Sequence, residues 1–109
     1  MKKSITLTLA ILAAALVSTT AADVKENYDK ACAKCHGADG KGQTKMGAKL
    51  NIKDLTDAKV QDSFKDEDAF KAIKEGLKDK DGKIQMKAAE GLSDDEIKAL
   101  VKHVRSFKK

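Results

Sequence analysis

Hydrophobic side chains recur at helical spacing near the carboxyl end of the chain, in the stretch LSDDEIKALVKHVRSF. Ser93 and Glu96 form a potential capping box, and the acidic residues that follow Ser93 would lie at the positive end of the helix dipole. We therefore predict a helix over residues 94–106. One side of this helix would carry the aliphatic residues Ile97, Leu100, Val101 and Val104.

Two earlier segments show the same helical period. The stretch DEDAFKAIKEG contains Gly76, which is a typical residue for ending a helix. Residues 24–34 predict another helix, with Tyr28 and Ala31 facing the interior. The apolar side of the helix in DEDAFKAIKEG would carry Ala69, Phe70, Ile73 and Leu77.

Strand patterns with a period of two are hard to find in the remainder of the chain. Long connections rich in glycine and lysine cover residues 37–62 and 78–91. Compact domains rarely contain loops of this length unless a function or a ligand organises them. The pattern predicts an all-α fold with three main helices, whose long loops wrap around an apolar group.

The amino-terminal segment has the composition of an export signal. Two lysines precede an uncharged run over residues 4–17, and small residues follow up to Ala22. This order is typical of a secretory signal peptide, with cleavage expected after Ala22. The alternative is an uncleaved membrane anchor, but the run is short for a spanning helix. We expect a signal peptide over residues 1–22, one domain over residues 23–109, a periplasmic location and no stable membrane insertion after cleavage.

The predicted mature domain is poor in large core-forming side chains. The whole chain has one tyrosine, three phenylalanines and no tryptophan or proline, and 36% of its residues are charged. Domains of this size commonly need a cofactor or another cross-link to fold stably. Such a composition is also compatible with disorder, but the strong helix caps argue against disorder throughout. We expect the mature chain to be largely unstructured without such a cofactor.

Both cysteines and one of the two histidines lie in the short stretch CAKCH, as Cys32, Cys35 and His36. A dithiol oxidoreductase motif would normally follow a strand in a βαβ unit, which this chain does not predict. A structural zinc site needs four ligands, and the only other histidine, His103, is distant in the sequence. A disulfide between the two cysteines would close too small a loop to stabilise the chain much.

The pattern C-x-x-C-H is the attachment signature of c-type haem. On a helical turn, positions i, i+3 and i+4 project from nearly the same side. Cys32 and Cys35 could therefore form thioether bonds to the two vinyl groups of one haem, while His36 ligates its iron. This interpretation uses every cysteine of the chain and agrees with the predicted export signal.

With this motif, the chain resembles the class I c-type cytochromes, which are small soluble monohaem carriers. The resemblance extends over the mature chain, from YDKACAKCHGADGKG near its start to KIQMKAAEGLSDDEIKALVKHVRSF at its end. It implies a cytochrome c-like fold with one haem c, bound covalently through Cys32 and Cys35. It also implies that the first and last helices cross, with Tyr28 facing Leu100 and His103.

The resemblance further implies a methionine as the sixth iron ligand, in a loop before the last helix. Met86 occupies this position, and Met46 is the competitor within the mature chain. His103 could be considered as another ligand, but a packing role is favoured. Members of the family often have a proline after the haem motif and another after the methionine, and this chain has neither. We nevertheless expect a backbone carbonyl within residues 42–50 to accept a hydrogen bond from His36 Nδ1.

His/Met ligation would leave no coordination position open to a substrate, so the resemblance implies a respiratory-type electron carrier and not an enzyme. The alternative is a haem-based gas sensor or a peroxidase-like enzyme with a displaceable sixth ligand. We expect a monomer that binds redox partner proteins through a lysine-rich haem edge and does not bind nucleic acid. The lysines expected to border the haem are Lys34, Lys41, Lys45, Lys49, Lys53, Lys83 and Lys87.

Overall fold

The computed structural model describes residues 21–109, and within this part the chain is mainly helical. The elements in chain order are α1 (Ala21–Ala31), α2 (Ala33–His36), α3 (Lys45–Leu50), α4 (Ala58–Asp62), α5 (Asp66–Glu75), β1 (Leu77–Lys78), β2 (Ile84–Met86) and α6 (Asp94–Arg105). The predicted signal peptide over residues 1–22 lies outside the described residues, apart from Ala21 and Ala22 at the start of α1.

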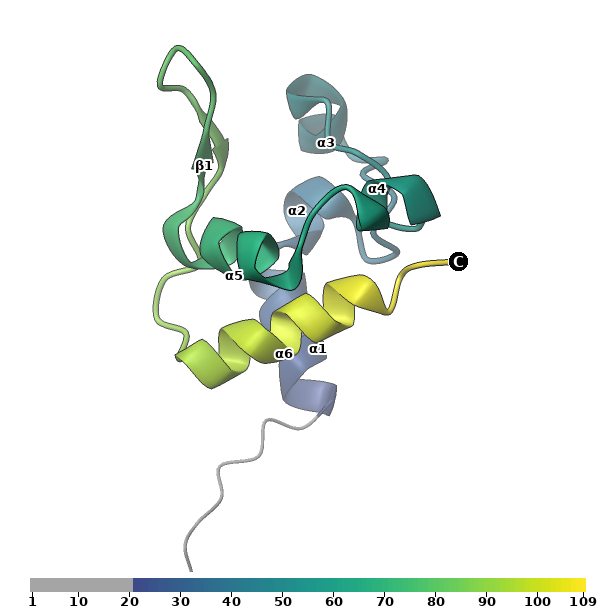
Figure 1. Ribbon diagram of the computed structural model, residues 1–109, viewed down its shortest axis with the longest axis vertical. Helices are drawn as coiled ribbons and strands as arrows, with labels where there is room; N and C mark the ends of the chain where they lie inside the picture. Colours follow the sequence, from purple (N-terminus) through teal and green to yellow (C-terminus); the bar gives the residue numbers. More distant parts are fainter. Residues whose placement is uncertain (1–20) are drawn as a thin grey trace, which may run out of the picture.

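The first and last helices cross and form the centre of the core. Figure 1 shows α6 lying across α1, with α5 beside α6. Tyr28 from α1 and Leu100 from α6 are almost completely buried, and Ile97 lies with them. Ile73 brings α5 into the same cluster. The predicted crossing of the terminal helices is therefore present, and the mainly helical architecture agrees with the predicted all-α fold.

Local sequence signals determine where α6 and α5 begin and end. Ser93 Oγ accepts a hydrogen bond from Glu96 N at 3.2 Å, and Ser93 N donates to Glu96 Oε1 at 3.1 Å, so the predicted capping box begins α6. Gly76 ends α5 with φ at 80°. Leu77, predicted on the apolar side of that helix, instead begins β1 and is 50% exposed.

The long connections contain structure that the sequence analysis did not predict. Short helices α3 and α4 lie in the first connection, and the second contains an antiparallel ribbon of β1 and β2. The ribbon turns through residues 79–82, where Gly82 N donates to Asp79 O at 3.1 Å; aspartate is favoured at the first position of such a turn and glycine at the last. Each of these elements is too short to give a clear hydrophobic period, so the sequence alone does not reveal it.

A buried glutamine joins α4 to α6. Gln61 is 1% exposed, and its Nε2 donates to Leu55 O at 2.6 Å and to Val104 O at 2.9 Å. The Arg105 guanidinium donates to Gln61 Oε1 at 3.0 Å, to the Gln61 carbonyl, and to Phe64 O at 2.8 Å. This network satisfies backbone carbonyls that would otherwise be buried without a partner, so it holds the central part of the chain against α6.

We expect Gln61→Leu to lower the free energy of unfolding of the haem-containing protein by about 2–3 kcal/mol, because buried acceptors lose their donors while the volume is nearly conserved. Chemical denaturation measures this change. Lys108→Gln is the control, since it breaks only an exposed ion pair with Asp62 and should cost less than about 1 kcal/mol. Equal effects of the two substitutions would contradict the structural role of Gln61.

Candidate haem site

The C-x-x-C-H motif lies where α1 gives way to α2. The predicted helix over residues 24–34 is interrupted at Cys32, whose φ of −122° departs from helical geometry. Cys32 O accepts hydrogen bonds from Cys35 N at 3.2 Å and from His36 N at 3.0 Å, which begin the short helix α2. The two cysteines are not joined in a disulfide; Cys32 is buried and Cys35 is half-buried.

The chain after the motif folds back against the motif's carbonyl groups. Gly42 N donates to His36 O at 2.7 Å, and Thr44 Oγ1 donates to Cys35 O at 2.8 Å. The same hydroxyl accepts a hydrogen bond from Gly47 N and begins α3. A Cβ atom at Gly47 would lie 2.1 Å from Gly42 O and 2.7 Å from Cys35 O, so only glycine permits this approach. The sequence analysis did not identify Thr44 or Gly47 as supports of the motif.

Tyr28 connects the motif to the crossing of α1 and α6. Its hydroxyl donates to Gly37 O at 2.6 Å, directly after His36. Its ring packs against His103 and Phe107, with centroid separations of 4.9 and 5.3 Å. Burial, followed by repulsion from nearby Cys32, raises the Tyr28 pKa, so the phenol stays protonated and can donate. His103 is thus a packing residue in this aromatic group, as the sequence analysis favoured.

Burial also determines the protonation of the motif. It raises the pKa of the Cys32 thiol to about 11, with a smaller contribution from repulsion by Cys35. It lowers the pKa of His36 and so favours a neutral imidazole, which is the form that ligates metals. His36 Nδ1 is buried and has no hydrogen-bond partner among residues 21–109. The carbonyl expected from residues 42–50 is therefore not found. In that range, the carbonyls of Thr44, Gly47 and Ala48 instead accept hydrogen bonds from backbone N–H groups of residues 48–52.

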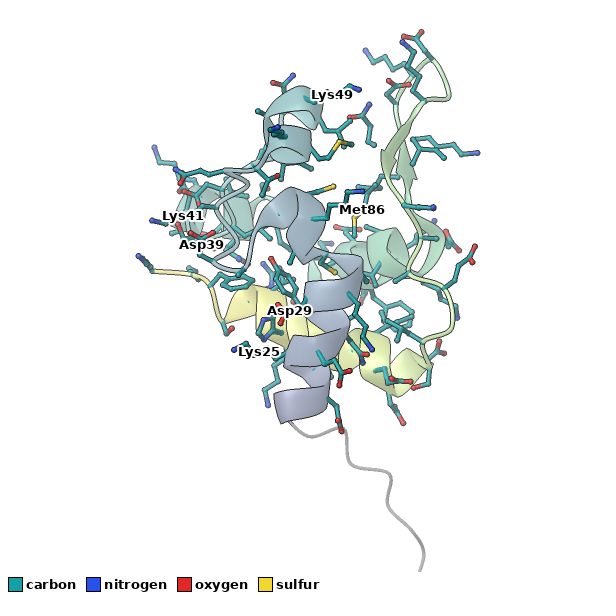
Figure 2. The ribbon with its side chains drawn as sticks, turned by 180° about the vertical axis from the view of Figure 1, so that it is seen from behind. Lys25, Asp29, Asp39, Lys41, Lys49 and Met86 are labelled. Carbon is teal, nitrogen blue, oxygen red and sulfur yellow. The ribbon has the colours of Figure 1, made fainter. Side chains whose placement is uncertain are left out.

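Two cavities meet at His36 and Met86. The first has a volume of about 260 Å³ and an almost entirely apolar lining that includes Ile73 and Val104. The second, of about 300 Å³, is lined by Cys32, Cys35 and Met46 as well as by His36 and Met86. Figure 2 shows Met86 between the β1–β2 ribbon and α2. The structure therefore brings all four predicted site residues to these two adjoining cavities. Met46 lines only the second cavity.

The residues of these cavities fit a haem group. Two thiols, a half-buried imidazole and a thioether are the donors expected for a c-type haem and its iron. The apolar lining suits the face of a macrocycle. Among the described residues, no group of three or more histidine, cysteine or acidic side chains could hold a metal ion, which leaves the zinc alternative without structural support.

No helix among residues 21–109 is long and apolar enough to cross a membrane.

Comparison with known proteins agrees with this geometry. The family model of cytochrome c matches residues 21–108. A search of curated proteins found no match. Among solved structures, the chain is similar to the KustC0563 c-type cytochrome, with 35% sequence identity and a TM-score of 0.66 over 78% of this chain and 96% of that one. The chain therefore belongs to the cytochrome c family, whose members bind haem c covalently and transfer electrons.

Proposed function

We propose that this cytochrome carries electrons with a single haem c, tethered by Cys32 and Cys35 and ligated by His36 and Met86. The observation that carries the proposal is the shared position of the imidazole and the Met86 thioether, which line both cavities. Met46 lines only the cavity beside the cysteines. The arrangement thus favours Met86 over Met46 as the partner of His36.

When bound, haem c supplies an iron that alternates between the ferrous and ferric states. The Met86 thioether is a soft donor that favours the reduced iron and raises the reduction potential. Ile73, Val104 and the rest of the apolar lining exclude water and disfavour extra charge. If His36 and Met86 both ligated the iron, a substrate would have no coordination position to occupy. This supports a carrier and not an enzyme.

The proposed carrier works in the periplasm as a monomer, in a respiratory-type chain, after removal of residues 1–22. Lys34 and Lys87 line the cavity that contains both cysteines, so positive charge borders the proposed haem edge. Figure 2 shows Lys49 on the adjacent helix α3. These lysines support weak, salt-sensitive docking of acidic redox proteins.

Carbon monoxide binding tests the proposed function. We expect the reduced protein to bind carbon monoxide only slowly at neutral pH, because Met86 must first be displaced, and to cycle reversibly between oxidation states. Rapid mixing followed by visible absorbance measures the association. Rapid saturation by carbon monoxide would contradict the carrier assignment and favour the gas sensor or peroxidase-like alternative.

A further inference from the structure

We propose that Gly76 and the β1–β2 ribbon position Met86 by holding its backbone, which makes Gly76 a positioning residue for the sixth ligand. This inference rests on the proposed function, in which Met86 ligates iron. The chain contains no proline, so no rigid residue follows Met86 to restrict the backbone there. Another feature of the structure must therefore fix the position of the thioether.

The closest support is the contact between Gly76 and the Met86 backbone. Gly76 ends α5, and its N donates to Ala72 O at 2.8 Å. A Cβ atom at Gly76 would lie 2.6 Å from Met86 O and 3.0 Å from Ala88 N. Both are backbone atoms, which cannot rotate away as a flexible side chain could. The absence of a side chain at Gly76 therefore allows the end of α5 to lie directly against the Met86 segment.

The ribbon supplies a second support. Leu77 pairs with Met86 and Lys78 pairs with Ile84 in the antiparallel ladder. Figure 1 shows the ribbon rising directly from the end of α5. The helix stop at Gly76 and the start of the ladder at Leu77 are consecutive, so the direction of β1 determines where Met86 lies.

Asp79 closes the other end of the ribbon. Its Oδ1 accepts hydrogen bonds from Asp81 N and Lys83 N, both at 2.9 Å, and its Oδ2 accepts one from Gln85 Nε2 at 3.1 Å. Asp79 N also donates to Lys83 O at 2.9 Å. These bonds restrain the strand that leads into Met86 without contacting the methionine.

A third support follows Met86. Ala89 N donates to Ile73 O at 2.8 Å, which returns the chain to α5 after the ribbon. The Met86 backbone is thus held twice: Met86 itself pairs with Leu77, and Ala89, three residues later, is bonded to Ile73. Ile73 also belongs to the core and lines the apolar cavity. The Ala89 hydrogen bond therefore anchors the segment after Met86 to the core.

Gly76→Ala tests this proposal in the haem-loaded protein. The added Cβ must displace Met86 O, so we expect carbon monoxide to bind the reduced protein about tenfold faster or more. Gly91→Ala is the matched control: Gly91 has a φ of 78°, close to the 80° of Gly76, but nothing lies within 4 Å of its Cβ position. The control also places a Cβ atom at a positive φ, and it should bind carbon monoxide at the wild-type rate. Amide exchange at Ala89 gives a second measurement, and it should be faster in Gly76→Ala only.

The outcomes separate this proposal from the proposed function. If Met86→Ala accelerates carbon monoxide binding but Gly76→Ala does not, the positioning role is wrong and the ligand assignment stands. Equal acceleration in Gly76→Ala and Gly91→Ala would also overturn the positioning role, because strain alone would then explain both. If Gly76→Ala does not fold, Asp79→Ala replaces it, since this variant loosens the ribbon without adding an atom. Unchanged carbon monoxide binding in Asp79→Ala would overturn the proposal.

Discussion

The double variant Cys32→Ala, Cys35→Ala is expected to lose all covalently attached haem and, with it, cooperative folding. Both thiols line one cavity with His36, and they are the only thiols available as tethers among residues 21–109. The core lacks tryptophan, and its largest fully buried hydrophobic side chains are Tyr28, Ile97 and Leu100. Removing the haem leaves the apolar cavity beside this small core without an occupant, and a domain of this size has little stability in reserve.

Intact mass, extraction with acid and acetone, and thermal unfolding measure this loss. Val24→Ala is the control for packing, because Val24 lies in the same core cluster as Cys32 and is similarly buried, at 8% against 7% exposed. This control should cost about 2 kcal/mol of stability and keep its haem through extraction. Haem that stays with the double variant after extraction, or a cooperative transition in its haem-free chain, would contradict the expectation.

Met86→Ala is expected to keep its haem but lower the reduction potential by roughly 0.1 V or more, because the proposed soft sulfur ligand is lost while both proposed tethers remain. Carbon monoxide should then bind the reduced protein rapidly. A redox titration followed by absorbance measures the potential. The geometry supports this outcome because Met86 lines both cavities beside His36.

Met46→Ala is the matched control for this experiment. Met46 lies on α3, is partly buried and lines only the cavity beside the cysteines. We expect its replacement to leave the potential and carbon monoxide binding near the wild-type values. If Met46→Ala produces the large change and Met86→Ala does not, the two methionines have been assigned the wrong way round.

The strongest local signals predicted the elements that pack into the core. The capping box at Ser93 and the aliphatic period that includes Leu100 located α6, and the glycine stop located the end of α5 at Gly76. These signals are reliable because each depends on residues close in sequence. The C-x-x-C-H motif likewise indicated the haem chemistry before any fold was known, since its spacing depends on a single turn of helix.

The features that escaped prediction depend on residues far apart in sequence. Gln61 gives no sign in the sequence that it will be buried, because its partners Val104 and Arg105 come from α6. Gly47 looks like an ordinary loop glycine until the Cys35 carbonyl is placed against it. The unpartnered Nδ1 of His36 is a similar case, since the sequence cannot show which carbonyls will already have donors.

The crossing of α1 and α6 has a consequence for the order in which the protein is made. Cys32 is buried in a core to which the last helix contributes Ile97 and Leu100. Synthesis proceeds from the amino end, so the cysteines emerge long before these partners exist. A nascent chain would thus keep both thiols accessible to an attachment apparatus. Because the haem-free chain is expected to be largely unstructured, this access would end only when the haem is attached and the last helix packs against the first.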